Sequence, residues 1–193
     1  MRIIAGKFRG RRLVTPRGAA TRPTTDRVRE AMFSTLSSRF DNLQGTSVLD
    51  MFAGSGALGI EALSRGAHHV TFVESAPDAR AALGRNVEAL GVHDAVFIDS
   101  RDAFCRTDAP IPGAPFSLLF LDPPYRIEPV RIRELMEDLV CGRSIGTGAV
   151  VVYEHRTGVE PVWPTGFEDV GDRIYGQTTV SYAQLSAGKE RTA

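Results

Sequence analysis

Short runs of apolar residues alternate, from Thr46 onward, with longer segments in which apolar residues recur at helical spacing. The runs predict strands at 47–52, 70–74, 95–98, 116–121 and 149–155, and the segments between them predict helices at 58–65, 77–90 and 129–140. Runs that are apolar throughout are typical of strands buried on both faces of a parallel sheet. Their alternation with helices predicts a doubly wound α/β fold whose sheet is mostly parallel.

The two ends of the chain depart from this alternation. Residues 167–175 and 178–184 predict a C-terminal antiparallel hairpin. Near the start, Ile3–Ala5 and Arg12–Val14 are short β-prone pieces around two glycines, which predicts a small N-terminal β-hairpin extension.

A helix leads from this extension into the main domain. After Pro23, Thr24 or Thr25 can cap a helix over 25–38, whose apolar positions recur at helical spacing at Val28, Met32, Phe33 and Leu36. We therefore expect a basic arm over 1–22, one main domain over 23–185 and a disordered tail over 186–193.

The net formal charge of zero conceals an uneven distribution. The first thirty residues contain nine Lys and Arg against two acidic residues, a balance of +7, and the remainder contains fourteen against twenty-one, a balance of −7. A basic arm on an acidic body predicts a polyanionic partner, with a solvated tail as the open alternative. The candidate contacts are Arg2, Lys7, Arg9, Arg11, Arg12, Arg17 and Arg22.

Composition narrows the class of protein further. A content of 42% hydrophobic and 24% charged residues is typical of a globular protein. The sequence predicts no membrane span, and its start does not resemble a signal peptide. Two cysteines cannot form a disulfide framework or a four-ligand zinc site, so we expect reduced thiols and a cytoplasmic location. The histidines lack the spacing of metal ligands, so no metal is expected; they are His68, His69, His93 and His155.

The first strand leads into a glycine turn, Asp50 to Gly59, which predicts a ligand site. Gly54, Gly56 and Gly59 have the spacing GxGxxG, in which glycines let a ligand approach the backbone and the next helix offers free N–H groups. The spacing alone also suits a nicotinamide-dependent oxidoreductase. Asp50, however, would repel a nearby pyrophosphate and attract a cationic or amine-bearing ligand.

Two further acids complete the predicted cofactor site. Glu74 ends the second strand, where it can accept hydrogen bonds from two ribose hydroxyls of either NAD or S-adenosylmethionine. Asp102 follows the third strand and can take an adenine amine, with the Ala103 N–H facing a ring nitrogen, although an ordinary helix cap is equally open. Phe52 can pack on the cofactor or on a substrate base, and an ordinary core position is the open alternative. The predicted cofactor set is Asp50, Phe52, Ala53, Gly54, Ser55, Gly56, Glu74, Asp102 and Ala103.

The tetrapeptide Asp122-Pro123-Pro124-Tyr125 at the end of the fourth strand is the most specific feature of the sequence. Two prolines cannot continue a strand or enter a helix interior, so they predict a rigid turn with fixed acceptors. An exocyclic base amine becomes a nucleophile when both of its N–H groups are held. We assign that task to the Asp122 carboxylate and the Pro123 carbonyl, with Tyr125 stacking on a flipped base.

Together these segments carry a family resemblance. LDMFAGSGALG and LDPPY resemble class I S-adenosylmethionine methyltransferases that modify exocyclic amines, whose sheet is Rossmann-like. The opening RIIAGKFRGRRL and RPTTDRVREAMFSTL resemble the bacterial 16S rRNA (guanine-N2)-methyltransferases of the RsmD family, over Met1 to about Leu185. The resemblance implies S-adenosylmethionine as methyl donor, S-adenosylhomocysteine as product, and a 16S rRNA guanine of the small subunit or its assembly intermediate as substrate. It also implies an RNA-binding arm, and we expect a monomer.

Three other functions stay open on the sequence alone. A DNA (adenine-N6) or other amine methyltransferase would use the same proline turn. A nicotinamide-dependent oxidoreductase would use the glycine turn but leave the proline turn unused. A non-catalytic rRNA-binding assembly factor would use only the arm.

Overall fold

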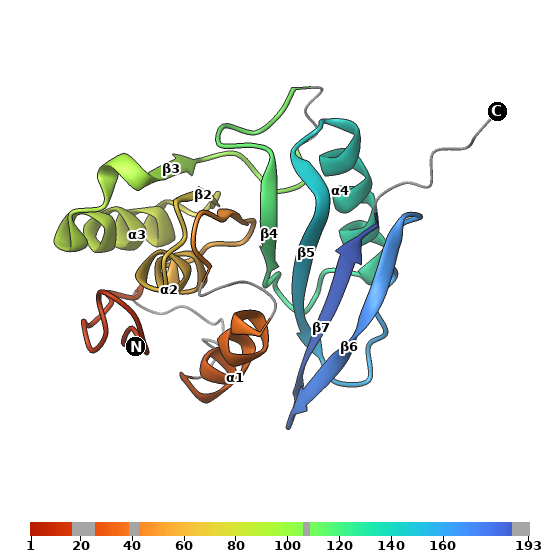
Figure 1. Cartoon of the computed structure of the whole chain (residues 1–193), viewed down its shortest axis with the longest axis horizontal. Coiled ribbons are helices and arrows are strands. Elements are labelled where there is room, and N and C mark those ends of the chain that lie inside the picture. Colours follow the sequence, from red (N-terminus) through yellow and green to blue (C-terminus); the bar gives the residue numbers. More distant parts are fainter. Residues whose placement is uncertain (17–25, 39–42, 106–108, 187–193) are drawn as a thin grey trace.

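The computed structural model describes residues 1–16, 26–38, 43–105 and 109–186. Within these ranges a seven-stranded sheet has the order β3-β2-β1-β4-β5-β7-β6 (Figure 1). The strands are β1 (Ser47–Asp50), β2 (His69–Val73), β3 (Val96–Asp99), β4 (Phe116–Leu121), β5 (Ile145–Arg156), β6 (Phe167–Tyr175) and β7 (Thr178–Leu185). The helices are α1 (Asp26–Ser37), α2 (Ala57–Ser64), α3 (Pro77–Leu90) and α4 (Pro129–Cys141), with a 3₁₀ turn at His93–Ala95.

The first five strands are parallel, and β7 enters antiparallel between β5 and β6. This topology confirms the predicted doubly wound fold with its C-terminal antiparallel hairpin. The strand order reverses between β1 and β4, which is where ligands bind in open α/β sheets.

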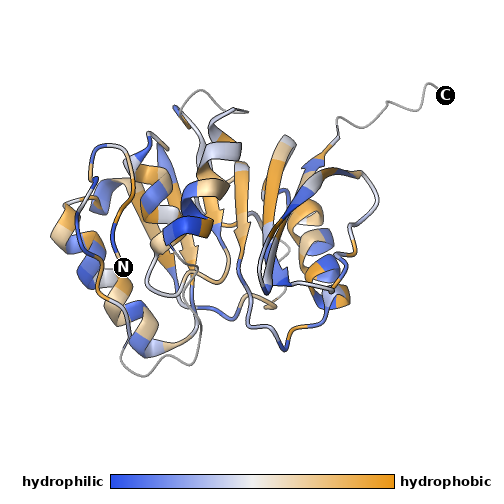
Figure 2. Cartoon of the chain, turned by 90° about the horizontal axis from the view of Figure 1, so that it is seen from below, coloured by the Kyte–Doolittle hydropathy of each residue, from blue (hydrophilic) through white to orange (hydrophobic). Residues whose placement is uncertain are grey.

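Helices cover both faces of the sheet, and alternate residues of each strand serve the two layers. Val48, Leu118 and Phe120 pack in one apolar cluster with α1, α2 and α3. Leu49 and Leu119 pack in a second cluster with α4. The central strands are accordingly mostly apolar, as Figure 2 shows by colour. Full burial of one such side chain stabilises the fold by about 1.5–3 kcal/mol.

β5 is longer than the sequence indicated, since it begins at Ile145 rather than 149. Ile145 pairs with Phe116, and the register shifts before Leu118 pairs with Val150. The glycines at 146 and 148 interrupt the apolar run and hide this first part of the strand from a periodicity argument.

The N-terminal arm folds back on itself as the predicted small hairpin, although it forms a single antiparallel bridge rather than a two-stranded ladder. Arg2 and Arg12 form a single antiparallel bridge, and Ile3 donates to the Arg11 carbonyl at 2.9 Å. Gly6 has φ +81° and a Cβ there would lie 1.7 Å from the Ser64 carbonyl oxygen, so the backbone lies directly on α2. The neighbouring helix takes the place of a ladder partner.

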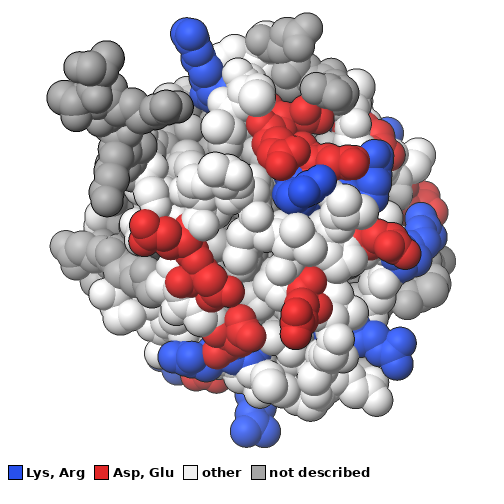
Figure 3. Space-filling view, turned by 90° about the vertical axis from the view of Figure 1, so that its right-hand side faces the viewer, with Lys and Arg blue, Asp and Glu red and all other residues white. Residues whose placement is uncertain are grey.

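The charged side chains are distributed unevenly over the molecule. The face on the side of β6 and β7, shown in Figure 3, carries several groups of acidic side chains interspersed with basic ones. Exposed acids on β6 are Glu168, Asp169 and Asp172. The basic arm lies at the other end of the sheet, beside α2 and α3 (Figure 1). Among the described residues, none of the helices combines the length and apolar character needed to span a bilayer.

Candidate active site

The carboxyl ends of β1, β2, β4 and β5 meet at one edge of the sheet. Asp50 is the register partner of Phe72 on β2 and of Phe120 on β4. The pairing continues into the glycine turn, where the Met51 N–H donates to the Phe120 carbonyl at 3.1 Å. Asp122 follows Phe120 by two residues, so the proline turn and the glycine turn begin on adjacent strands.

The glycine turn is open on one side and closely packed on the other. Gly54 has φ +55°, and a Cβ on it would meet nothing within 4 Å. Gly56 has φ +84°, and a Cβ on it would lie 2.4 Å from Leu83 Cδ1 of α3. A ligand can therefore approach the backbone at Gly54, while Gly56 lets α2 begin against α3.

Glu74, at the end of β2, is hydrogen-bonded to the glycine turn. Its Oε2 accepts the Gly54 N–H at 2.8 Å and its Oε1 accepts the Ala76 N–H at 2.7 Å. Each carboxylate oxygen can accept a second bond through its other lone pair, and the residue is partly exposed. Glu74 can therefore hold the turn and accept ligand hydroxyls together.

Asp50 lies beneath the turn. It is 1% exposed, and its Oδ2 accepts the Gly59 N–H from the first turn of α2 at 3.0 Å. Burial raises the pKa of Asp50 to about 7; the Gly59 hydrogen bond lowers it, and the charge of Glu74 raises it further. The structure thus gives Asp50 a contact that fixes α2 to β1, and its predicted role toward a cationic ligand stays a prediction.

This burial predicts a pH-dependent stability. The native carboxyl keeps its proton up to about pH 7, whereas the unfolded one, with its ordinary value of 3.8, loses it near pH 4. The native state binds more protons between these values, so Asp50 lowers the free energy of unfolding as pH rises through the window, by at most about 1.4 kcal/mol per pH unit. We expect Asp50→Asn to lose less stability than the wild type between pH 5 and 8 in urea titrations. The same change at the exposed Asp94 is the control, and parallel curves for Asp50→Asn and the wild type would contradict the assignment.

Phe52 and the 102–104 turn lie together beside the glycine turn. The rings of Phe52 and Phe104 have centroids 5.7 Å apart. Asp102 is exposed, and its Oδ1 accepts the Phe104 N–H at 2.8 Å, which is a capping contact. Ala103, which stands between Asp102 and Phe104 in the sequence, is half-buried. The predicted adenine contacts are thus near the predicted cofactor loop, although Asp102 also caps its own turn.

A cleft of about 210 Å³ lies beyond the proline turn. The segment 123–129 forms one wall. The end of β5 and the residues just after it form the other wall, with Tyr153, Glu154, His155, Arg156 and Val159. Tyr125 is 48% exposed, and its hydroxyl is 2.9 Å from Thr178 Oγ1 at the start of β7. The ring is therefore tethered beside the cleft with one part of its surface accessible.

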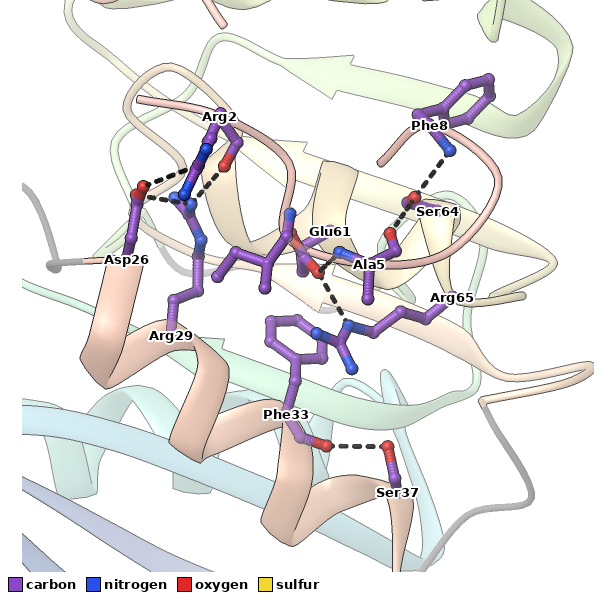
Figure 4. A network of polar contacts seen from close by, with 11 residues as sticks. Arg2, Ala5, Phe8, Asp26, Arg29, Phe33, Ser37, Glu61, Ser64 and Arg65 are labelled. Atoms are coloured by element: carbon purple, nitrogen blue, oxygen red, sulfur yellow. Dashed lines mark hydrogen bonds and ion pairs between the residues drawn. The ribbon is translucent and has the colours of Figure 1, made fainter. Parts of the chain in front are cut away.

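The arm is fixed to α2 by buried polar groups (Figure 4). Glu61 is fully buried, and its carboxylate accepts the Ile4 and Ala5 N–H groups at 2.8 and 3.0 Å. The same carboxylate binds Arg65 Nε at 2.8 Å. The Ser64 hydroxyl accepts the Phe8 N–H and donates to the Ala5 carbonyl. The arm is thus held through its backbone.

Holding the arm by its backbone leaves its cations available. Lys7, Arg9, Arg11 and Arg12 are exposed. The Arg2 guanidinium is also exposed, 3.7 Å from Asp26. Arg17 and Arg22, which were predicted to belong to the same surface, lie outside the described residues, as do the predicted cap at 24 or 25 and residues 187–193 of the predicted tail.

A family model described as "Conserved hypothetical protein 95" matches residues 1–184. This is the RsmD family indicated by the sequence motifs. The chain belongs to this family.

Curated relatives and a solved structure resemble the chain over most of its length. "Putative rRNA methyltransferase YlbH" of Bacillus subtilis is 35% identical over 94% of this chain and 97% of that protein. "Ribosomal RNA small subunit methyltransferase D" of Escherichia coli strain K12 is 39% identical over 72% of this chain and 65% of that protein. The crystallised "Putative methyltransferase yhhF" of Escherichia coli has a TM-score of 0.80 and 29% identity, covering 97% of this chain and 98% of that one. The predicted family of S-adenosylmethionine-dependent methyltransferases is thereby confirmed.

The β5 wall of the cleft in this RsmD-family chain was not predicted from the sequence. Tyr153 pairs in register with Leu121, so Glu154, the next residue of β5, is level with Asp122, the first residue after β4. Glu154 is buried. His155 Nε2 is 2.8 Å from Ser181 Oγ, and its ring lies 4.8 Å from that of Tyr153. An acid directly after the apolar run 149–153 was the available signal in the sequence, but its significance depends on β5 lying next to β4.

Proposed function

We propose that the chain transfers a methyl group from S-adenosylmethionine to the exocyclic 2-amino group of a guanine in 16S rRNA of the small ribosomal subunit. The observation that carries this proposal is the pair of turns on adjacent strands, one built of glycines and one of prolines. The printed names of the Bacillus and Escherichia relatives support rRNA as the substrate class, and the second supports the small subunit.

The residues around the glycine turn suit the cofactor. Open space at Gly54 leaves room for close approach of a ligand, and Glu74 has lone pairs left for ribose hydroxyls. Phe52, Ala53, Ser55 and Gly56 complete the proposed cradle, with Asp102 and Ala103 beside it. When bound, S-adenosylmethionine supplies a methyl group on a sulfonium, which needs no further activation by the protein.

The proline turn suits an amine nucleophile. The Asp122 carboxylate and the Pro123 carbonyl accept one N–H each, which leaves the nitrogen lone pair directed out of the base plane. Pro124 keeps this turn rigid, and the Tyr125 ring stacks on the base. The nitrogen forms the new bond to the methyl carbon as the carbon–sulfur bond breaks, S-adenosylhomocysteine leaves, and the Asp122 carboxylate takes up the proton that the nitrogen releases. Alignment supplies most of the rate enhancement.

Guanine suits the carboxylate pair formed by Asp122 and Glu154. Guanine presents its N1–H next to its 2-amino group, so the Glu154 carboxylate can accept the N1–H while Asp122 and the Pro123 carbonyl accept the two amine N–H groups. Adenine presents an unprotonated N1 at the corresponding position, which a carboxylate repels. The buried position of Glu154 in the cleft wall favours a base with adjacent donors.

The arm suits the RNA backbone. Arg2, Lys7, Arg9, Arg11 and Arg12 are exposed on a segment held by α2, and Arg17 and Arg22 belong to the same basic sequence. Such contacts supply affinity without sequence information, and they weaken as salt rises.

A methylation assay tests the proposal. The chain is incubated with labelled S-adenosylmethionine and small subunits from a strain that lacks the corresponding gene, beside naked 16S rRNA and duplex DNA. We expect one N2-methylguanine per subunit, identified by mass spectrometry of the digested RNA. Label in DNA but not in subunits would favour a DNA amine methyltransferase, and label in neither would refute the proposal.

A further inference from the structure

Asn86, on the buried side of α3, joins the arm to the glycine turn. It is 2% exposed. Its Nδ2 donates to the Ser55 carbonyl and to the Val14 carbonyl, both at 2.9 Å, and its Oδ1 accepts the Val14 N–H at 2.7 Å. Ser55 belongs to the predicted cofactor cradle, and Val14 lies near the end of the described part of the arm, residues 1–16. One side chain therefore satisfies backbone groups of two segments that are far apart in the sequence.

Only an amide suits this arrangement among side chains of its size. Both N–H groups of Asn86 are used, and its oxygen pairs with an N–H, so that Val14 is bound as it would be by a neighbouring strand. Ser55 lies between Gly54 and Gly56, which both have positive φ and allow the peptide groups between them more than one orientation. The bond to its carbonyl therefore selects one orientation of the cofactor turn.

The other described anchors of the arm lie elsewhere. Glu61 and Ser64 hold the stretch from Ile4 to Phe8 on α2. Beyond Val14 a hollow of about 520 Å³ separates the chain from α3, lined by Val14, Thr15, Pro16, Asp78, Ala81 and Arg85. The arm is thus fixed at Asn86 by Val14, and the described residues directly after Val14, Thr15 and Pro16, line the hollow.

We propose that Asn86 is a positioning residue that couples the arm to the glycine turn, so that RNA on the arm and the S-adenosyl compound in the turn strengthen each other's binding. This inference rests on the proposed function, in which the arm binds RNA and the turn binds the cofactor. RNA that orders the arm holds Val14 in place, which keeps Asn86 and hence the Ser55 carbonyl in the binding orientation. Coupling is reciprocal, so the cofactor increases RNA affinity by the same factor.

Equilibrium dialysis of labelled S-adenosylhomocysteine measures this coupling. Its Kd is determined with and without saturating unmethylated small subunits for the wild type, Asn86→Ala, Asn86→Asp and the surface control Glu88→Ala. We expect subunits to lower the Kd by about fivefold or more for the wild type and the control. For both Asn86 variants the ratio should fall to about one. Asn86→Asp is the sharper variant because its carboxylate faces two carbonyl oxygens.

The outcomes separate the two proposals. If folded Asn86→Ala keeps the wild-type ratio of Kd values, or if small subunits leave the Kd of the wild type unchanged, the role of Asn86 is refuted while the proposed function stands. If the wild type binds no S-adenosylhomocysteine at all, the proposed function itself fails.

Hydrogen exchange on the wild type keeps the test available should the variants not fold. Without RNA, S-adenosylhomocysteine should slow exchange of the Val14 amide, which is bonded to Asn86. The Phe8 amide, bonded to Ser64, is the internal control and should change less. Unchanged exchange at Val14 in the presence of bound S-adenosylhomocysteine would overturn the coupling.

Discussion

Replacing Asp122 by alanine is expected to lower the rate of methyl transfer by about 10²–10³-fold while leaving the Kd for S-adenosylhomocysteine near its wild-type value. The magnitude is that of removing one fixed hydrogen-bonding group that acts on the reacting atoms. Asp122 begins the proline turn, on the strand next to the glycine turn, so its loss affects the amine rather than the cofactor cradle. Single-turnover assays on small subunits, beside dialysis of S-adenosylhomocysteine, measure the two effects separately.

Two companion variants sharpen this result. Asp122→Asn keeps an oxygen acceptor in the same place and should lose less activity than Asp122→Ala. Tyr125→Ala should act mainly on the KM for RNA, because stacking on a base contributes about 1–3 kcal/mol to binding. Asp94→Ala, at an exposed position beyond α3, controls for loss of a carboxylate as such. An Asp122→Ala enzyme with a normal single-turnover rate would remove Asp122 from the mechanism.

The central strands could be predicted closely because their environment allows only one kind of sequence. β4 is buried on both faces between α4 and the other helices, and its predicted bounds coincide with the observed Phe116–Leu121. α3 was also predicted with its bounds, since Pro77 begins it and Gly91 ends it in the left-handed conformation. Local chemistry determines these elements, so local reasoning finds them.

The polar groups that hold the arm and the glycine turn could not be predicted, because charged and polar side chains are usually exposed and these are buried. Glu61 is fully buried although acids rarely are, and in the sequence it resembles a solvated helix position. Asn86 resembles an ordinary helix residue until the fold places Val14 and Ser55 against it. The place of Glu154 in the β5 wall of the cleft likewise depends on which strand neighbours β4. Pairings between distant segments, rather than residue types, decide these roles.

The third glycine of the GxGxxG spacing has a role that involves no ligand. Gly59 lies in α2, and a Cβ there would be 2.3 Å from Phe72 Cε1 and 2.7 Å from Val70 Cγ1 of β2. Both partners are fully buried. The helix can approach the sheet this closely only without a side chain, which is the packing role expected of this glycine. The spacing therefore reports on helix–strand packing, and that is why it did not distinguish a methyltransferase from an oxidoreductase.

Gly59→Ala should therefore destabilise the chain by about 2–3 kcal/mol, because overpacking of a fully packed core forces the helix or Phe72 to move. Gly84→Ala is the matched control, since Gly84 also lies within a helix and a Cβ there meets nothing within 4 Å. Alanine favours helix over glycine by about 1 kcal/mol, so the control should be slightly more stable than the wild type. Urea unfolding of the three proteins measures both changes.

The Gly59 variant should also bind S-adenosylhomocysteine more weakly. Its N–H anchors α2 to Asp50, and displacement of the helix lengthens that 3.0 Å bond and shifts the glycine turn from which α2 begins. If Gly59→Ala and Gly84→Ala were equally stable, α2 would be free to move away from β2. The close packing of α2 on β2 would then not be what maintains the shape of the cofactor turn.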